Sequence, residues 1–101
     1  MEYRDLEKVR VIIKDATGLD ISYAYDDLIF PDNTAFILQY DDQNNKNFSC
    51  YFHEDCLLHE QERILENLNK ACQKQECSLV FNGSFFLEQN GQEVEIHFNK
   101  K

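Results

Sequence analysis

The segment from residue 55 to residue 75 carries apolar side chains at the three- and four-residue spacing of an α-helix. The stripe consists of Leu57, Ile64, Leu65, Leu68, Ala71 and Cys72. A second amphipathic helix is predicted over residues 3–16, and Gly18 can adopt the left-handed conformation that ends it. A helix with one apolar face has to bury that face, so the rest of the chain has to supply a second layer.

The remaining segments alternate with the two-residue period of β-strands. Strands are predicted at 21–26, 34–40 and 48–53, with a turn at residues 30–33, where Pro, Asp and Asn favour turn geometry. After residue 77, Asn-Gly dipeptides at 82–83 and 90–91 predict two hairpins. A turn at the second dipeptide predicts the cross-strand pairs Leu87–Val94 and Phe85–Ile96. The other face of this hairpin carries Phe86, Glu88, Glu93, Glu95 and His97.

These patterns predict an α+β fold in which two helices are packed on one face of a mainly antiparallel sheet. The expected order is αβββαββ(β), the last strand being optional. The chain has 101 residues, of which 43% are hydrophobic, and no linker divides it. We therefore expect a single compact domain over residues 1–101.

The formal net charge is −9, from 19 acidic and 10 basic residues. This charge repels phosphate backbones and anionic lipid headgroups, which disfavours direct contact with nucleic acid or a membrane. The first residues mix acids and bases where a signal peptide would have an apolar stretch. We therefore expect a cytoplasmic protein whose four cysteines are reduced.

The acidic residues are concentrated in residues 15–62, which hold eleven acids and a single base, Lys46. Acidic doublets lie at 26–27, 41–42 and 54–55, and an antiparallel meander can bring such segment ends together. One interpretation is a solvated surface that maintains solubility. The other is a recognition surface for a basic protein, in which tyrosines anchor the contact. Its expected residues are Asp26, Asp27, Asp41, Asp42, Glu54, Asp55, Tyr25 and Tyr40.

The second interpretation favours a non-enzymatic inhibitor or adaptor whose carboxylates stand in for phosphates. In size and charge the chain is similar to DNA mimics such as phage anti-restriction and anti-CRISPR proteins, and to immunity proteins that neutralise basic nucleases. That similarity implies a basic, nucleic-acid-binding protein as the partner. An alternative is a homodimeric protein-binding module similar to secretion chaperones in its element order, with the dimer contact around Phe86.

Cysteine and histidine recur every three residues at Cys50, His53, Cys56 and His59, which makes a zinc-binding domain a minor alternative. However, strand alternation places Cys50 and His53 on opposite faces, and the paired short spacings of a zinc finger are absent. Cys56 and His59 could pair as nucleophile and base, but no oxyanion hole or orienting group accompanies them. We therefore expect no catalytic residues, no metal and no cofactor.

Overall fold

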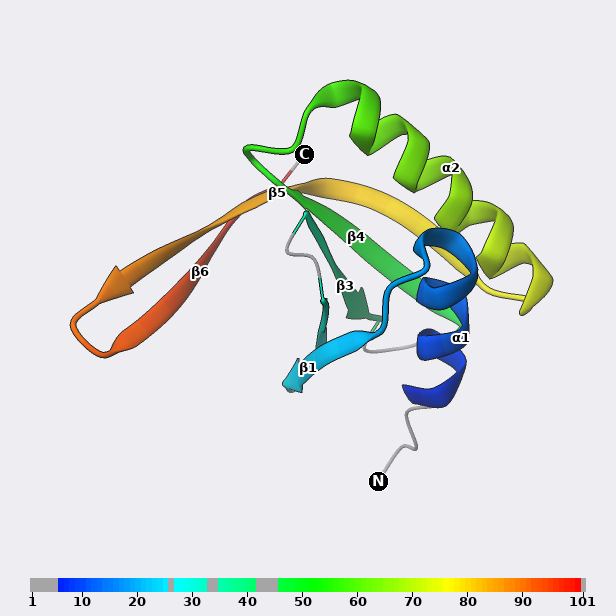
Figure 1. The fold of residues 1–101 in the computed structure, drawn as a ribbon, viewed down its shortest axis with the longest axis horizontal. Helices are drawn as coiled ribbons and strands as arrows, with labels where there is room; N and C mark the ends of the chain where they lie inside the picture. Colours follow the sequence, from blue (N-terminus) through cyan, green and yellow to red (C-terminus); the bar gives the residue numbers. More distant parts are fainter. Residues whose placement is uncertain (1–5, 26, 33–34, 42–45, 101) are drawn as a thin grey trace.

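The computed structural model describes residues 6–25, 27–32, 35–41 and 46–100. It is an α+β structure with two helices and a six-stranded, mostly antiparallel, curled sheet (Figure 1). The elements in chain order are α1 (Leu6–Thr17), β1 (Ile21–Tyr25), β2 (Leu28–Pro31), β3 (Phe36–Tyr40), β4 (Asn47–His53), α2 (Leu58–Lys74), β5 (Ser78–Asn90) and β6 (Glu93–Lys100). Within the described residues, neither helix has the length and apolar character needed to span a membrane.

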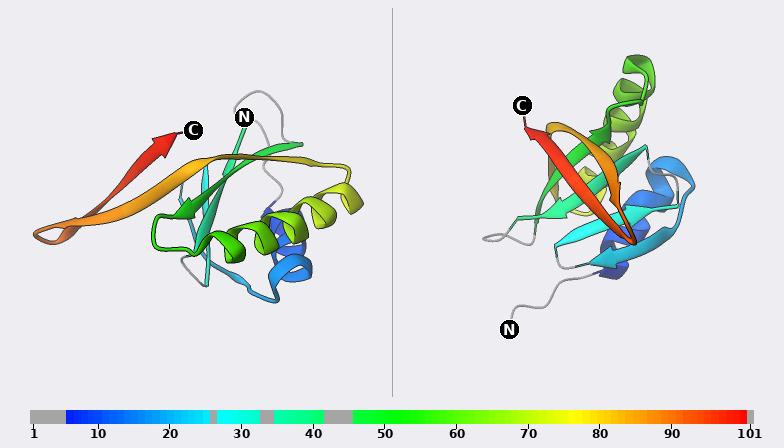
Figure 2. Two further views of the ribbon diagram at one scale, coloured as in Figure 1. Left: turned by 90° about the horizontal axis from the view of Figure 1, so that it is seen from above. Right: turned by 90° about the vertical axis from the view of Figure 1, so that its left-hand side faces the viewer.

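The strands follow one another across the sheet in chain order, from β1 at one edge to β6 at the other. All neighbours are antiparallel except β4 and β5, which are parallel because α2 carries the chain back between them. The β4–β5 register begins with Asn47 opposite Ser78 and ends with His53 opposite Phe85. Because β5 continues to Asn90, the β5–β6 hairpin extends beyond the end of β4, away from the rest of the molecule (Figures 1 and 2).

The main apolar cluster contains side chains from both helices and from one face of the sheet, here called the helix side. Its buried members include Val9, Ile12 and Ile13 of α1, Ile64, Leu68 and Cys72 of α2, and Phe36, Leu38, Cys50 and Phe52 of the strands. Each fully buried side chain of this size contributes about 1.5–3 kcal/mol to folding. Leu57 was predicted to join the stripe of α2, but the helix begins only at Leu58, and Leu57 is 62% exposed.

A bulge at Asn82 and Gly83 lets β5 contribute to both faces of the sheet. The β4–β5 register shifts at this point and leaves Asn82 without a cross-strand partner in β4. Gly83 has a φ of 142°, which side chains rarely allow. Because of the extra residue, Phe81 packs on the helix side, whereas Phe85 is buried on the opposite face.

The opposite face, here called the open face, has a smaller apolar cluster. Ile37, Tyr51 and Phe85 are each 1% exposed, and Leu28, Phe30 and Ile96 pack against them. No helix of the described chain covers this face (Figures 1 and 2). Its burial comes instead from the curl of the sheet.

The observed order is αββββαββ, with one more strand before α2 than predicted. Residues 28–31 form β2, so the turn predicted at 30–33 begins inside a strand; Asn33 lies outside the described residues. A strand of four residues gives too short an alternation to be distinguished from a turn. Pro31 is tolerated at the end of this strand, where the next N–H, that of Asp32, donates to the Asp20 carbonyl at 2.9 Å.

The tail also differs from the prediction. The Asn-Gly dipeptide at 82–83 forms the bulge and not a hairpin, so the tail has two strands. In the second hairpin, Asn90 pairs with Glu93, which makes Gly91 and Gln92 the loop. The observed cross-strand pairs are therefore Leu87–Ile96 and Phe85–Phe98. The predicted register was wrong by two residues, which leaves every side chain on its predicted face.

Candidate functional site

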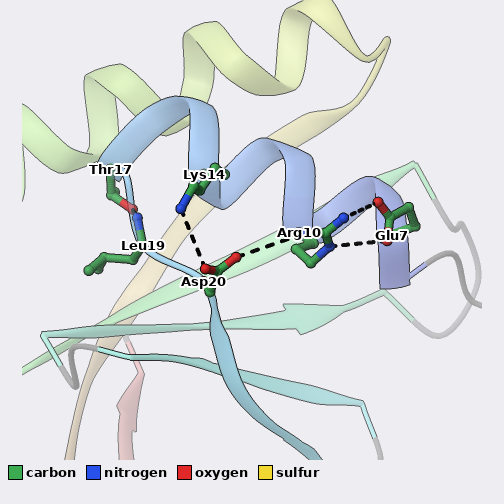
Figure 3. Close-up of polar contacts among 6 residues, drawn as sticks. All are labelled: Glu7, Arg10, Lys14, Thr17, Leu19 and Asp20. Atoms are coloured by element: carbon green, nitrogen blue, oxygen red, sulfur yellow. Dashed lines mark hydrogen bonds and ion pairs between the residues drawn. The ribbon is translucent and has the colours of Figure 1, made fainter.

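The charges on the two helices are nearly balanced. Six bases and five acids lie on α1 and α2, so the strands, loops and termini carry the net negative charge. Asp20, just before β1, lies 3.8 Å from Arg10 and 3.4 Å from Lys14 (Figure 3). Arg10 also hydrogen-bonds Glu7 and lowers the pKa of that carboxyl. Further ion pairs are Arg63–Glu60, Lys70–Glu66 and Lys74–Asp15.

The open face holds most of the exposed large apolar side chains of the described residues. Six of the ten lie on it: Tyr23 (57% exposed), Tyr25 (64%), Val80 (59%), Leu87 (43%), Val94 (59%) and Phe98 (36%). Tyr23 stacks on Phe30 at a ring distance of 5.7 Å, and Phe98 contacts Tyr51 at 4.6 Å. Extended apolar surfaces of this kind are typical of interaction sites.

A cross-strand row joins the two sides of this face. It runs from β1 to β5 through Tyr25, Leu28, Gln39, Ser49 and Val80. The face is therefore continuous from the edge strand β1 to the bulged strand β5, and the β5–β6 hairpin extends it further.

A chain of hydrogen bonds crosses the floor of the open face. Asn82 Nδ2 donates to the Tyr51 hydroxyl oxygen at 2.9 Å, and that hydroxyl donates to Gln39 Oε1 at 3.1 Å. Gln39 Nε2 donates in turn to Asp27 Oδ2 at 2.9 Å. These bonds hold the half-buried Asp27 carboxylate at one end of the face.

A second carboxylate lies at the other end of the same face. The backbone N–H of Asp55 donates to His53 Nδ1 at 3.0 Å, and the Asp55 carboxylate lies 3.7 Å from that nitrogen. The His53 ring packs edge-on against Phe85, with ring centroids 5.2 Å apart. The N–H of Glu54 donates to the Phe85 carbonyl at 3.0 Å, which fixes the turn after β4.

The predicted acidic residues therefore divide between two ends of the sheet. Asp27 and Asp41 lie at one end, where the Tyr40 N–H donates to the Asp27 carbonyl at 2.9 Å. Glu54 and Asp55 lie at the opposite end, because the antiparallel strand β4 separates them from Asp41. The described members of the three doublets therefore do not lie together, since the third doublet is one strand further along. The remaining predicted residues, Asp26 and Asp42, lie outside the described residues.

The two tyrosines predicted for the partner-binding surface lie on opposite faces of the sheet. Tyr25 is exposed on the open face, but Tyr40 is 6% exposed and packs against Phe48 on the helix side, with ring centroids 5.3 Å apart. Tyr40 is therefore a core residue, and its predicted place at a partner-binding surface is wrong.

The cysteine and histidine candidates do not form a metal site. Cys50 is buried in the helix-side core, His53 points to the open face, and His59 is exposed. Among the described residues, no three His, Cys, Asp or Glu side chains are grouped so that they could hold a metal ion. Partial burial and nearby Glu60 raise the pKa of Cys56, which makes that thiol a weaker nucleophile.

The face predicted for a dimer contact is polar. Phe86 is half-buried and stacks on His97, with ring centroids 4.9 Å apart. His97 Nε2 lies 3.5 Å from the carboxylates of both Glu88 and Glu95. Phe86 is thus partly covered by its own hairpin.

Sequence reasoning did not identify the open face as a site. The predicted register places Phe98 opposite Gly83 and not opposite Phe85, and the alternation of Val94 and Ile96 was interpreted only as the apolar face of the hairpin. One sequence signal for this face was available. The apolar alternation continues to the tip of the hairpin, and two helices packed on the sheet cannot cover the tip. Gln39 and Asn82 gave no sequence signal, because their role depends on the register and the bulge.

Comparisons of the chain with protein-family models, curated proteins and solved structures gave no match.

Proposed function

We propose that this chain is a non-enzymatic protein that binds and inhibits a basic protein, of the kind that itself binds nucleic acid. Contact would be made by the open face together with the carboxylates at its ends. The observation that supports this proposal is the coincidence of exposed apolar side chains and acidic residues on the side of the sheet away from the helices. The function would be that of a DNA mimic, an anti-restriction or anti-CRISPR protein, or an immunity protein.

Charge favours a basic partner. The two helices carry a net charge of +1. Because the whole chain has a net charge of −9, the residues outside the helices carry a net charge of −10. This arrangement attracts a basic protein toward the strands and loops, and it raises the rate of encounter at low salt. The exposed tyrosines then supply contacts from which water is excluded when the partner binds.

The same charge disfavours the homodimeric, secretion-chaperone-like alternative. Two copies that met around Phe86 would bring Glu88 and Glu95 of each copy together, at a Coulombic cost. A stable, salt-insensitive dimer in light scattering would favour that alternative.

The test is site-specific photo-crosslinking in lysate of the native host. A photoreactive residue in place of Tyr25 reports on the open face, and one in place of Val11, which is 41% exposed on α1, is the control. We expect Tyr25 alone to capture a basic protein, whose nucleic-acid binding or cleavage the purified chain then inhibits. Equal capture from both positions, or a captured protein that is not basic, would contradict the proposal.

Charge-reversal variants measure how much the carboxylates contribute to the affinity for the captured protein. With the captured protein purified, Asp27→Lys combined with Asp41→Lys should weaken binding by at least about tenfold, and 0.5 M salt should weaken it further, because both act on charge attraction. Glu66→Lys, on α2, is the matched control and should change affinity by less than about twofold. Unchanged affinity in the first variant would refute the charge-based part of the proposal.

A further inference from the structure

The outer edge of β6 is an open strand edge in the described part of the chain. β6 is the last strand of the sheet and pairs only with β5 (Figure 1). Edge strands are commonly shortened, bulged or interrupted by proline, because an open edge can pair with another chain. The opposite edge strand, β1, has five residues and an irregular register between Ile21 and Tyr23. β6 has eight residues, a regular register with β5 and no proline, so it is the edge that can accept a further strand.

The hairpin turn determines which backbone groups of β6 face outward. Its loop has two residues, so the flanking pair Asn90–Glu93 is a hydrogen-bonded pair. Hydrogen-bonded and non-hydrogen-bonded pairs alternate along antiparallel strands, which directs the N–H and C=O groups of every second residue away from β5. In β6 these residues are Val94, Ile96 and Phe98. Their backbone groups form a row of donors and acceptors along the edge.

We propose that this edge pairs with β6 of a second copy of the chain, antiparallel and in one register. The twofold axis passes at Ile96, which lies opposite Ile96 of the second copy, and Val94 lies opposite Phe98 of the second copy. All these residues present outward backbone groups, so the pairing forms hydrogen bonds along the strand. Because residues opposite each other share a face, the open faces of the two copies become continuous. This pairing goes beyond the function proposed above and does not depend on it.

The side chains of β6 are complementary to one another in this register. On the open face, Val94 (59% exposed) meets Phe98 (36% exposed) of the second copy, so two apolar side chains cover each other. On the other face, Glu95 lies opposite His97 of the second copy. An axis at Glu95 would place two like charges opposite each other, and an axis at His97 would leave Glu95 opposite Asn99. The pattern therefore selects both the register and a second copy as the occupant.

His97 provides a separate observation that supports this pairing. Its Nε2 atom is buried and makes no hydrogen bond within the described residues, although the carboxylates of Glu88 and Glu95 in its own hairpin lie 3.5 Å away. Buried polar atoms in native structures usually have a hydrogen-bond partner. In the proposed dimer, the Glu95 carboxylate of the second copy lies on the adjacent strand, opposite this ring. The second copy thus brings a further acceptor to the imidazole.

The net charge of the chain determines how this dimer responds to salt. Two copies that each carry a charge of −9 repel each other, and salt screens the repulsion. The edge contact itself consists of backbone hydrogen bonds, apolar pairs and Glu–His pairs, and it does not stack the two faces around Phe86 on each other. Dimerisation should therefore strengthen as salt rises, whereas the binding of a basic partner should weaken.

Sedimentation velocity of the purified chain at several concentrations tests the proposal. We expect the mass to rise with concentration from that of one chain to that of two, at lower concentrations in about 0.5 M salt. Val94→Pro removes an N–H that β5 does not use, and proline is tolerated on edge strands. It removes two symmetry-related hydrogen bonds and should weaken dimerisation by at least about tenfold. The matched control, Val94→Thr, keeps the N–H and should weaken it by less than about fivefold.

Cysteine crosslinking tests the register independently of proline. In a Cys56→Ser background, which removes the least buried native thiol, Val94→Cys chains are mixed with Phe98→Cys chains and oxidised. Opposite residues in a hydrogen-bonded antiparallel pair are about 5.5 Å apart, within reach of a disulfide. The two copies of residue 94 are four positions apart along the strands, about 14 Å. We therefore expect covalent dimers from the mixture and none from Val94→Cys chains alone.

Three results would overturn the proposal. The first is the mass of a single chain at every concentration up to about 1 mM. The second is a dimer that Val94→Pro leaves unchanged, and the third is crosslinking of Val94→Cys chains alone as efficient as that of the mixture. None of these results bears on the proposed function, which the photo-crosslinking at Tyr25 tests separately.

Discussion

Removal of the Tyr51 hydroxyl should destabilise the fold by breaking the hydrogen-bond chain under the open face. Tyr51→Phe removes the acceptor of the 2.9 Å bond from Asn82 and the donor of the 3.1 Å bond to Gln39, at a site that is 1% exposed. Each bond contributes about 1 kcal/mol net, so the expected loss is about 2 kcal/mol. For a domain of this size, that loss lowers Tm by about 8–16 °C.

Urea unfolding followed by far-UV circular dichroism measures this loss, with the m-value expected to stay constant. Tyr25→Phe is the matched control, because Tyr25 is 64% exposed; it should stay within about 0.5 kcal/mol of the parent. Asn82→Ala in the Tyr51→Phe background should cost less than in the parent chain, because the bond is already broken. A loss below about 0.5 kcal/mol for Tyr51→Phe would refute the role assigned to the hydrogen-bond chain.

Three further predictions concern the core, a turn and the thiols. Leu68→Ala, at a position with 0% exposure, should cost about 2–5 kcal/mol in urea unfolding, and a loss below about 1 kcal/mol would contradict the packing. Gly18→Ala should cost about 1 kcal/mol despite open space around it, because φ is 78°; equal stability would contradict that conformation. Burial raises the pKa of Cys72 to about 12 and raises that of Cys50 further, so at pH 8 both stay protonated and protected. A thiol reagent followed by mass spectrometry should label Cys56 first, and early labelling of Cys50 would contradict its burial.

The sequence pattern predicted the elements whose apolar period is long. Both helices and the strands β3, β4 and β6 follow from repeats that extend over several residues, and the fold class follows from them. The four residues of β2 are too few to show a period. The Asn-Gly dipeptide at 82–83 favours both a tight hairpin and a bulge, and only the pairing with β4 selects the bulge.

The candidate site was less predictable, because it depends on the number of strands between residues. Asp27 and Asp41 are two strand lengths apart and return to one end of the sheet, whereas Asp55 lies one strand further and reaches the other end. Side-chain alternation and register, and not strand number, separate the two tyrosines: Tyr25 pairs with Leu28 on the open face, and Tyr40 pairs with Phe48 on the helix side. Local composition identifies acidic and aromatic residues as candidates, but it cannot say which face of the sheet each one occupies.

The central claim, that the open face is the contact surface, is tested most directly by hydroxyl-radical footprinting of the chain with its captured partner. Tyr23 and Tyr25 are 57% and 64% exposed, and Leu57 and Leu58 at the start of α2 are 62% and 70% exposed. The two pairs are therefore matched in access to the radical. We predict that the partner protects the tyrosines and leaves the leucines oxidised as in the free chain. Protection of the leucines with unprotected tyrosines would place the contact on the helix side and contradict the account.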